Sequence, residues 1–116
     1  ETKIPELLIE TIQYLPKNFN KKSIFLDSKK ISAALSVRKW REGDRISPVG
    51  MEGSQLVSDI IKDGKISVQD KAEVLVVEDD EEIVWVVGLK VGGRKIADSL
   101  TEEIVKISIK NLNIYI

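Results

Sequence analysis

The residues of this sequence whose types best suit ligand binding form a basic group around a tryptophan. The group consists of Arg38, Lys39, Arg41 and Arg45, and Trp40 lies among them. Arginine and lysine fix proteins on nucleic-acid backbones, and arginine can bind a phosphate through two parallel hydrogen bonds. We therefore interpret the group as a candidate phosphate-binding patch. The alternative is a solvated surface loop in which Asp44 and Arg45 neutralise each other.

Further cations extend the candidate patch, and the tryptophan allows two interpretations. The additional cations are Lys62, Lys65, Lys90 and Arg94. Lys62 and Lys65 come at the end of an expected helix, where positive charge also complements the helix dipole. Trp40 either stacks on a base or ribose of a bound RNA or packs its ring at the edge of the core. The apolar surroundings of Trp85 predict a core position.

Residues that shape loops are interspersed with the basic group and follow it. They are Gly43, Asp44, Pro48, Gly50, Gly53 and Asp59. Glycine and proline favour turns, and aspartate accepts hydrogen bonds from nearby backbone amides. We expect Asp44 to shape a turn and not to act as a catalytic acid. We expect Asp59 to bond to backbone amides or to an arginine of the preceding loop.

Several classes of catalytic site are excluded by composition. The sequence has no histidine and no cysteine, so it cannot form Ser-His-Asp triads, Cys-His pairs or HExxH zinc sites. The acidic run at residues 78–82 lacks the glycine of a calcium loop and is typical of a solvated hairpin tip. The glycines at positions 88, 92 and 93 match no phosphate-loop motif. We therefore expect no catalytic residue, metal or cofactor within this chain, and an independent enzyme is disfavoured.

The candidate patch must be positioned by a domain rich in strands. Extended patterns are expected at residues 6–15, 23–26, 32–38, 73–77, 83–87, 103–109 and 112–116. One helix is expected at residues 54–63, capped by Ser54 and followed by Gly64, and a short one at residues 67–71, capped by Ser67. Residues 73–77 and 83–87 predict a hairpin around the polar loop 78–82, and their continuous apolar character predicts burial on both faces.

Length and charge limit the possible roles of the chain. Its 116 residues, 42% of them hydrophobic, correspond to one domain without an internal boundary. The net charge is only -1 although 32% of residues are charged, so nucleic-acid contacts would need a local patch. No membrane span or signal peptide is expected. The lack of cysteine fits the cytoplasm. The chain starts with Glu1, which suggests a fragment of a longer protein.

The ordered pattern of these residues resembles a known family. The pattern R-x-W-x-x-G-D-R-x-x-P-x-G-M-x-G begins at Arg38, and Ser58 and Asp59 follow it in the expected helix. It is similar to the C-terminal substrate-binding domain of tRNA(Ile)-lysidine synthetase. The similarity spans about residues 35–109 and includes the block IVWVVGLK at residues 83–90. The family often has a Lys-Lys pair where this sequence has Gln55 and Leu56, and an arginine where it has Lys90.

The resemblance implies a fold and a function. The implied fold is α+β, a small β-rich domain with packed sheets in a sandwich-like arrangement and two to three short helices. The implied function is to grip tRNA(Ile) while a catalytic domain of the same polypeptide ligates lysine to the wobble cytidine with ATP and Mg²⁺. The resemblance thus implies a tRNA-modifying ligase as the parent enzyme. The catalytic domain of such enzymes carries an SGGxDS-type pyrophosphate loop, and no such loop occurs in this chain.

An alternative function belongs to a different class. The chain could be a structural or protein-interaction module that docks on its catalytic partner or forms a homodimer. This alternative rests on the near-neutral charge and on the apolar strands, including the tail NLNIYI. An unpaired edge strand in the tail could pair with another chain.

Overall fold

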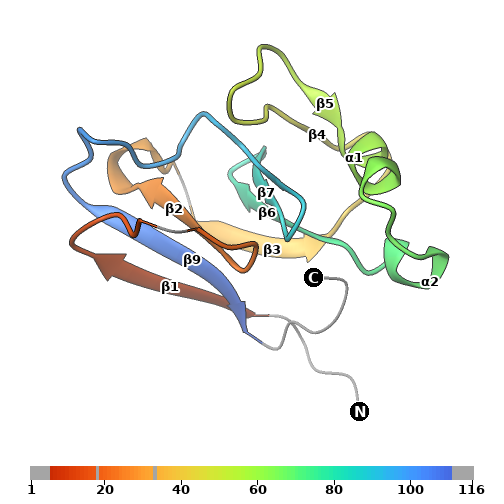
Figure 1. The fold of residues 1–116 in the computed structure, drawn as a ribbon, viewed down its shortest axis with the longest axis horizontal. Helices are drawn as coiled ribbons and strands as arrows, with labels where there is room; N and C mark the ends of the chain where they lie inside the picture. Colours follow the sequence, from red (N-terminus) through yellow and green to blue (C-terminus); the bar gives the residue numbers. More distant parts are fainter. Residues whose placement is uncertain (1–5, 18, 33, 111–116) are drawn as a thin grey trace.

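The computed structural model describes residues 6–17, 19–32 and 34–110. Three antiparallel strands form the first sheet, in the order β1-β9-β2 (Figure 1). Their bounds are Glu6–Ile12 for β1, Ser23–Asp27 for β2 and Ile104–Lys110 for β9. The register places Ile9 and Ile24 on either side of Ile107. The extended segments expected in these three regions are thus confirmed as strands, whereas residues 112–116 lie outside the described residues.

The second sheet has the order β3-β6-β7-β4-β5, and β8 pairs with β7. Its strands are β3 (Leu35–Lys39), β4 (Arg45–Ile46), β5 (Gln55–Leu56), β6 (Leu75–Asp79), β7 (Glu82–Val86) and β8 (Lys90–Val91). The β6–β7 hairpin is confirmed, but its tip is shorter than the expected loop at residues 78–82. Asp80 takes a φ of 63° at the tip, which aspartate tolerates better than most residues, so the strands continue further into the acidic run.

Two short α-helices pack beside the second sheet. They are α1 (Val57–Asp63) and α2 (Val68–Lys71), and a single 3₁₀ turn spans Ser28–Lys30. Ser67 caps α2 as expected, because its side chain accepts a hydrogen bond from the Asp70 amide. The expectation for Ser54 was wrong: α1 begins after Leu56, which provides no side-chain cap.

The end of α1 also differs from the expected glycine terminator. Gly64 has φ −75° and remains helical, and the left-handed conformation falls on Lys65 at φ 55°. A Cβ atom on Gly64 would lie 3.3 Å from the Ile60 carbonyl oxygen and from Leu89 Cδ2. The close contacts, and not a left-handed backbone, are therefore what favours glycine at position 64.

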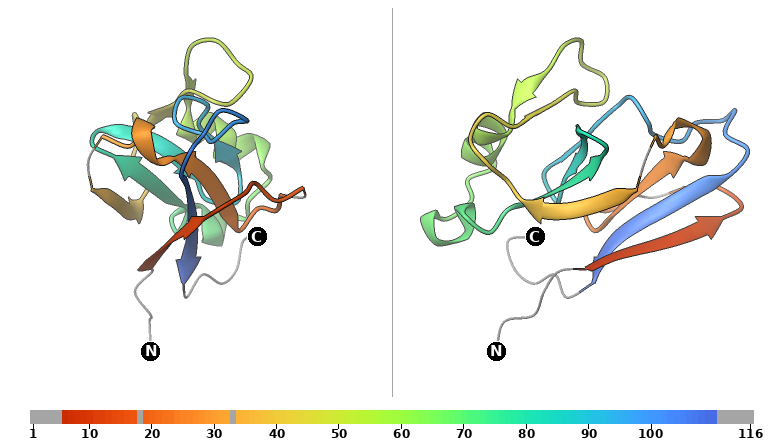
Figure 2. Two further views of the ribbon diagram at one scale, coloured as in Figure 1. Left: turned by 90° about the vertical axis from the view of Figure 1, so that its left-hand side faces the viewer. Right: turned by 180° about the vertical axis from the view of Figure 1, so that it is seen from behind.

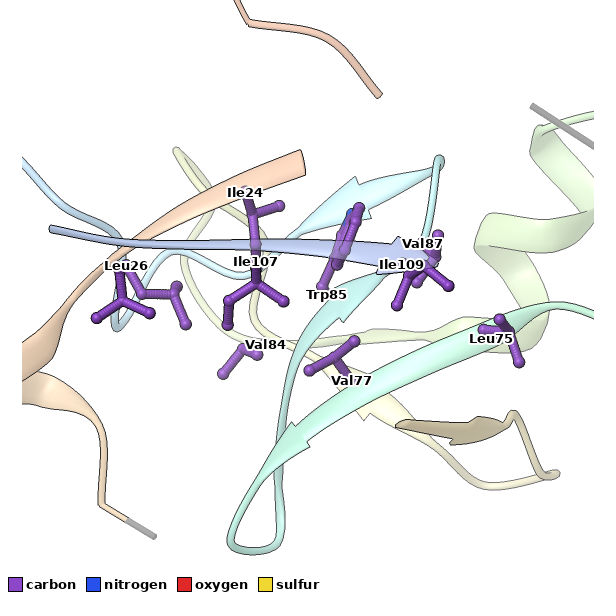
Figure 3. Close-up of a cluster of buried hydrophobic side chains, with 10 residues drawn as sticks. Ile24, Leu26, Leu75, Val77, Val84, Trp85, Val87, Ile107 and Ile109 are labelled. Atoms are coloured by element: carbon purple, nitrogen blue, oxygen red, sulfur yellow. The ribbon is translucent and has the colours of Figure 1, made fainter. Parts of the chain in front are cut away.

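The central strands β6 and β7 of the second sheet are buried on both faces, as their apolar runs predict. Figure 3 shows Ile24, Leu26 and Ile107 of the first sheet facing side chains such as Val77 and Val84 of the second. The opposite face contacts α1 through Val57, Ile60 and Ile61. The β6–β7 register is irregular between Val77 and Glu78. Opposite this irregularity, the consecutive residues Val84 and Trp85 both belong to the core between the sheets. Figure 2 shows these layers from two further sides.

A buried ion pair helps to join the two sheets. The Lys95 ammonium contacts the carboxylate of Asp79, whose side chain is 0% exposed. The Ser32 amide donates to the same carboxylate at 2.7 Å, and the Lys95 backbone oxygen accepts from the Asp27 amide in the first sheet at 2.9 Å. Lys95 therefore links the end of β6 to β2, and holds the segment that follows β8.

The observed architecture agrees with the expected class of two packed sheets and a few short helices, with strands predominating. Neither helix in the described residues has the length and apolar character of a membrane span.

Replacing Lys95 by alanine should lower the free energy of unfolding by about 3 to 5 kcal/mol, because Asp79 would lose the charge that compensates its burial. Urea denaturation measures the effect. Lys30→Ala is the matched control: Lys30 pairs with Asp98 at 3.6 Å at the surface, so its loss should cost less than about 1 kcal/mol. Equal effects of the two substitutions would contradict a structural role for the buried pair.

Candidate functional site

Arg38 is the centre of an ion-pair network that joins β3, the following turn and β6. Its Nη1 and Nη2 atoms donate to the two carboxylate oxygens of Asp44 at 3.0 Å each. Its Nε and Nη2 atoms donate to the carboxylate of Glu78 at 3.0 and 3.1 Å. A further bond from Nη1 reaches the Lys39 backbone oxygen. All three guanidinium nitrogens are thus engaged by partners within the chain.

Asp44 shapes the turn before β4, as expected. Its side chain accepts a bond of 2.7 Å from the Arg41 amide, and its own amide donates to the Arg41 carbonyl oxygen. Gly43, with φ 92°, supplies the conformation that the turn requires. The Asp44 carbonyl oxygen also accepts from the Val57 amide at the start of α1. One turn therefore connects β3, β4 and the helix.

Mutual stabilisation changes the acidity of both partners in this network. Hydrogen bonds first from Asp44 and then from Glu78 raise the pKa of Arg38 above its ordinary value. Burial by itself would raise the pKa of Asp44, but bonds from the Arg38 guanidinium and the Arg41 amide outweigh it, and the pKa of Asp44 is lowered. Both groups are therefore charged at neutral pH.

Trp40 packs at the edge of the core and is not presented for stacking. Its Nε1 atom donates to the Lys71 carbonyl oxygen at 2.7 Å, and its ring contacts the apolar cluster beneath α1. The core interpretation of Trp40 therefore holds, and the stacking interpretation is dropped. Trp85 is 1% exposed, in line with its expected core position.

The β4–β5 loop, residues 47–54, is held in a defined shape. Arg45 Nε donates to Ser54 Oγ at 2.7 Å across the base of the loop, so Ser54 anchors the loop and not the helix. The Val49 amide donates to Val91 and the Met51 amide to Pro48. Gly50 and Gly53 have φ values of 76° and 78°, which explains glycine at both positions. Pro48 is buried and bridges to Gly92.

The segment after β8 packs directly against this loop. The Gly93 amide donates to the Ser47 carbonyl oxygen at 2.9 Å, and a Cβ atom at Gly93 would approach Val49 Cα to 2.8 Å. Glycine is therefore required for the close approach. A hollow of about 260 Å³ remains between the two segments. Its lining residues are Ser47, Pro48, Gly50, Met51, Gly53, Gly93 and Arg94.

A second hollow of about 180 Å³ lies between α1 and the start of β8. It is lined by Gln55, Ile60, Asp63, Gly64, Leu89 and Lys90. The buried Gln55 Oε1 atom accepts no hydrogen bond within the described residues. Lys90 at the start of β8 thus lines this hollow, and Arg94 beyond the end of the same strand lines the first one.

Of the remaining predicted cations, some form ion pairs with carboxylates and the others do not. Lys39 contacts Glu73 at 3.2 Å and is partly neutralised. Arg94 comes no closer than 4.0 Å to Glu82 in its ion pair. No ion pair with a carboxylate is formed in the described chain by Arg41, Arg45, Lys62, Lys65 or Lys90, all of which are exposed.

Some features of the site could not be anticipated from the patch alone. Ser54, Gly93 and Lys95 hold the loop and the segment after β8, but each depends on a partner distant in sequence. Asp59 was expected to bond to backbone amides or to an arginine of the preceding loop. It is exposed on α1, and its side chain makes no hydrogen bond within the described residues. The described residues also contain no group of three or more acidic side chains placed to hold a metal ion.

Comparison with known proteins assigns the chain to a family. A family model of the TilS substrate C-terminal domain matches residues 35–107, which include the Arg38 network, both hollows and most of β9. The chain belongs to this TilS substrate C-terminal domain family. Its curated relatives with similar sequences include tRNA(Ile)-lysidine synthases.

Two such relatives show the extent of the similarity. The enzyme of Parabacteroides distasonis is 35% identical over 97 residues, which cover 84% of this chain and 22% of the relative. The enzyme of Bacillus subtilis is 36% identical over 86 residues, 72% of this chain and 18% of the relative. The chain therefore spans about a fifth of the length of these curated relatives.

Solved structures support the same fold. The crystal structure of a TilS C-terminal domain matches with a TM-score of 0.81, at 23% identity, over 95% of this chain and 86% of that one. A fragment of the phenylalanyl-tRNA synthetase β-subunit from Pyrococcus horikoshii matches with a TM-score of 0.60, at 13% identity, over 75% of this chain and 27% of that one. At these identities the likeness concerns the fold.

The Arg38→Ala substitution should lower the free energy of unfolding by about 2 to 4 kcal/mol, because Asp44 and Glu78 would remain close together without their shared cation. Arg38→Lys should restore little, since an ammonium cannot make the forked contacts. Arg41→Ala, a neighbouring exposed arginine, should change stability by less than about 0.5 kcal/mol. Urea denaturation distinguishes these outcomes, and similar values for Arg38→Ala and Arg41→Ala would refute the network's role.

The lowered pKa of Asp44 predicts a pH-dependent contribution to stability. A carboxylate whose folded pKa lies below its ordinary value of 3.8 stabilises the fold above that pH, and this stability disappears as the pH falls through the folded pKa. Asp44→Asn should therefore destabilise the chain at neutral pH, and its difference from wild type should narrow below pH 3.8. Urea titrations over this range test the trend, with the exposed Asp63→Asn as control. A constant difference for Asp44→Asn would rule the trend out.

Proposed function

We propose that this chain is the tRNA-binding module of a tRNA(Ile)-lysidine synthase, in contact with the phosphate backbone of tRNA(Ile). The observation that carries the proposal is the set of exposed cations around a rigid loop. Arg45, Lys90 and Arg94 surround the β4–β5 loop and its two hollows. Family membership and the named relatives favour tRNA as the ligand.

The cations of this surface differ from those that stabilise the fold. Arg38 and Lys95 are held by carboxylates with little exposure to solvent. The Arg94 side chain is 70% exposed, and its 4.0 Å contact with Glu82 is weak. Exposed cations can exchange counterions for phosphates, and the grooves of A-form RNA favour contacts with phosphates and 2′-hydroxyls. We therefore assign the phosphate contacts to the exposed group, and exclude Arg38 from it.

Catalysis would belong to another domain of the same polypeptide. That domain would ligate lysine to the wobble cytidine with ATP and Mg²⁺, while this chain holds the tRNA. The absence of histidine and cysteine from the whole sequence limits the reactive groups available here. The proposed task of this chain is binding and placement of the RNA, in the cytoplasm where the modification would take place.

An interaction module for domain docking or dimerisation is a second candidate. One observation favours it: β1 pairs only with β9 in the described chain, and its residues Leu8 and Ile9 are 44% and 55% exposed. An uncovered apolar edge can pair with another strand. This surface belongs to the first sheet and leaves the cations around the β4–β5 loop without a role, so we place it second.

The tRNA-binding role predicts a charge-specific loss of affinity. The double variant Lys90→Gln with Arg94→Gln should bind tRNA(Ile) more weakly, and the slope of log affinity against log salt should fall by about one for each phosphate contact removed. Fluorescence anisotropy of labelled tRNA, measured with the whole natural polypeptide that contains this chain, provides both quantities.

The double variant Lys106→Gln with Lys110→Gln is the matched control for this prediction. It removes the same charge from β9, where Lys106 alternates with the buried Val105 and Ile107 and so faces away from the second sheet. Its affinity and salt slope should stay close to those of the wild type. If both double variants lost affinity equally, net charge and not the loop surface would explain the binding.

A further inference from the structure

Backbone hydrogen bonds and one close backbone contact shape the hollow beside the β4–β5 loop. Backbone bonds at Val49, Met51 and Gly93 fix its two walls relative to each other, and the Arg45–Ser54 bond closes the base of the loop. The contact of Gly93 with Val49 leaves no space for a side chain between the walls. A ligand entering this hollow would meet an ordered surface, and little of its binding energy would be lost in ordering the loop.

The residues that line the hollow include both apolar and charged side chains. Met51 lines the hollow and is apolar, yet it is 53% exposed. Arg94 lines the hollow with a side chain that is 70% exposed. The amides of Gly50 and Gly53 donate no hydrogen bond within the described residues. The site therefore offers an apolar side chain and a cation within one small space.

We propose that this hollow binds one unpaired nucleotide of the RNA, with its base against Met51 and its phosphate on Arg94. The assignment rests on the proposed tRNA-binding function and identifies a position at which a single-stranded residue is bound. A methionine thioether makes favourable contacts with aromatic rings, and the guanidinium suits a phosphate. The volume of about 260 Å³ lies below the usual range for drug-sized ligands, about 300 to 1,000 Å³, so one base is a better match than a large cofactor.

The nucleotide must be unpaired for a geometric reason. Bases within an A-form helix are stacked on both sides, and only their edges face the grooves. A base can contact the Met51 side chain with its ring face only at a helix end, in a loop or in a single-stranded tail. A free mononucleotide presents the same chemistry, and the test below separates it from a nucleotide within RNA.

The single methionine of the sequence makes the hollow directly observable. Because Met51 is the chain's one methionine, an isotope-labelled methionine methyl group gives one NMR signal that reports on this hollow. The 116-residue chain is titrated with a blunt RNA hairpin and with the same hairpin carrying a short single-stranded 3′ tail. Ring currents of a stacked base should shift the Met51 methyl signal with the tailed RNA and much less with the blunt RNA.

Affinity measurements with matched variants complete the test. The tailed hairpin should bind more tightly than the blunt one, and Met51→Ala should reduce that advantage by about two- to tenfold while leaving the blunt hairpin unaffected. Leu100→Ala is the control, because Leu100 is an apolar residue that is 87% exposed in the turn before β9. It should preserve the advantage of the tail.

The possible outcomes separate this inference from the function on which it rests. The same two hairpins are therefore also tested with the whole natural polypeptide that contains this chain, and failure of that polypeptide to bind either hairpin would overturn the tRNA-binding role and this inference together. Binding of both with equal affinity, or a tail advantage that persists in Met51→Ala, would overturn this inference alone. Displacement of the tailed hairpin by nucleoside monophosphates at concentrations similar to those of the RNA would assign the hollow to free nucleotides and overturn its assignment to RNA.

Discussion

The forked contact of Arg38 with two carboxylates is the interaction on which the arrangement of the site depends. Asp44 and Glu78 come from a turn and from β6, and two carboxylates this close would repel each other without a cation between them. A planar guanidinium can serve both at once. By fixing the turn that leads into β4, the contact determines where the β4–β5 loop begins and therefore where the exposed cations are presented.

Charge in this chain thus has two separate uses, which explains how a net charge of -1 is compatible with an RNA-binding role. Buried or half-buried cations such as Arg38 and Lys95 offset acidic groups inside the fold, where each pair is costly to break. Arg94 and Lys90 remain at the surface with weak partners or none in the described chain. Glu42 lies in the turn before β4 and Glu52 in the β4–β5 loop. Local contacts, and not a uniform positive field, would therefore have to hold RNA.

Features that depend on neighbouring residues could be predicted from the sequence, whereas contacts between residues distant along the chain could not. The hairpin of β6 and β7 and the Ser67 cap follow from apolar runs and from a residue next to its helix. The position of Trp40 was left open, because only the fold brings its ring nitrogen to the Lys71 carbonyl. Ser54 was assigned to the nearby helix because a cap was the closest partner visible in the sequence. Its observed partner, Arg45, lies across the base of the loop. The bonds between Arg38 and Glu78 were likewise not expected, since Glu78 is remote along the chain.

A rigid loop is an advantage for a module of this kind because its isolated affinity would be low. A few phosphate contacts are easily screened by salt, so useful binding requires a second RNA contact from a linked domain. Linkage turns the second contact into an intramolecular step, but it raises affinity only when both surfaces can engage the RNA together. A loop that changed shape would lose that geometry. The ion pairs of Arg38 and Lys95 would therefore support binding, because they keep the exposed cations in a constant position.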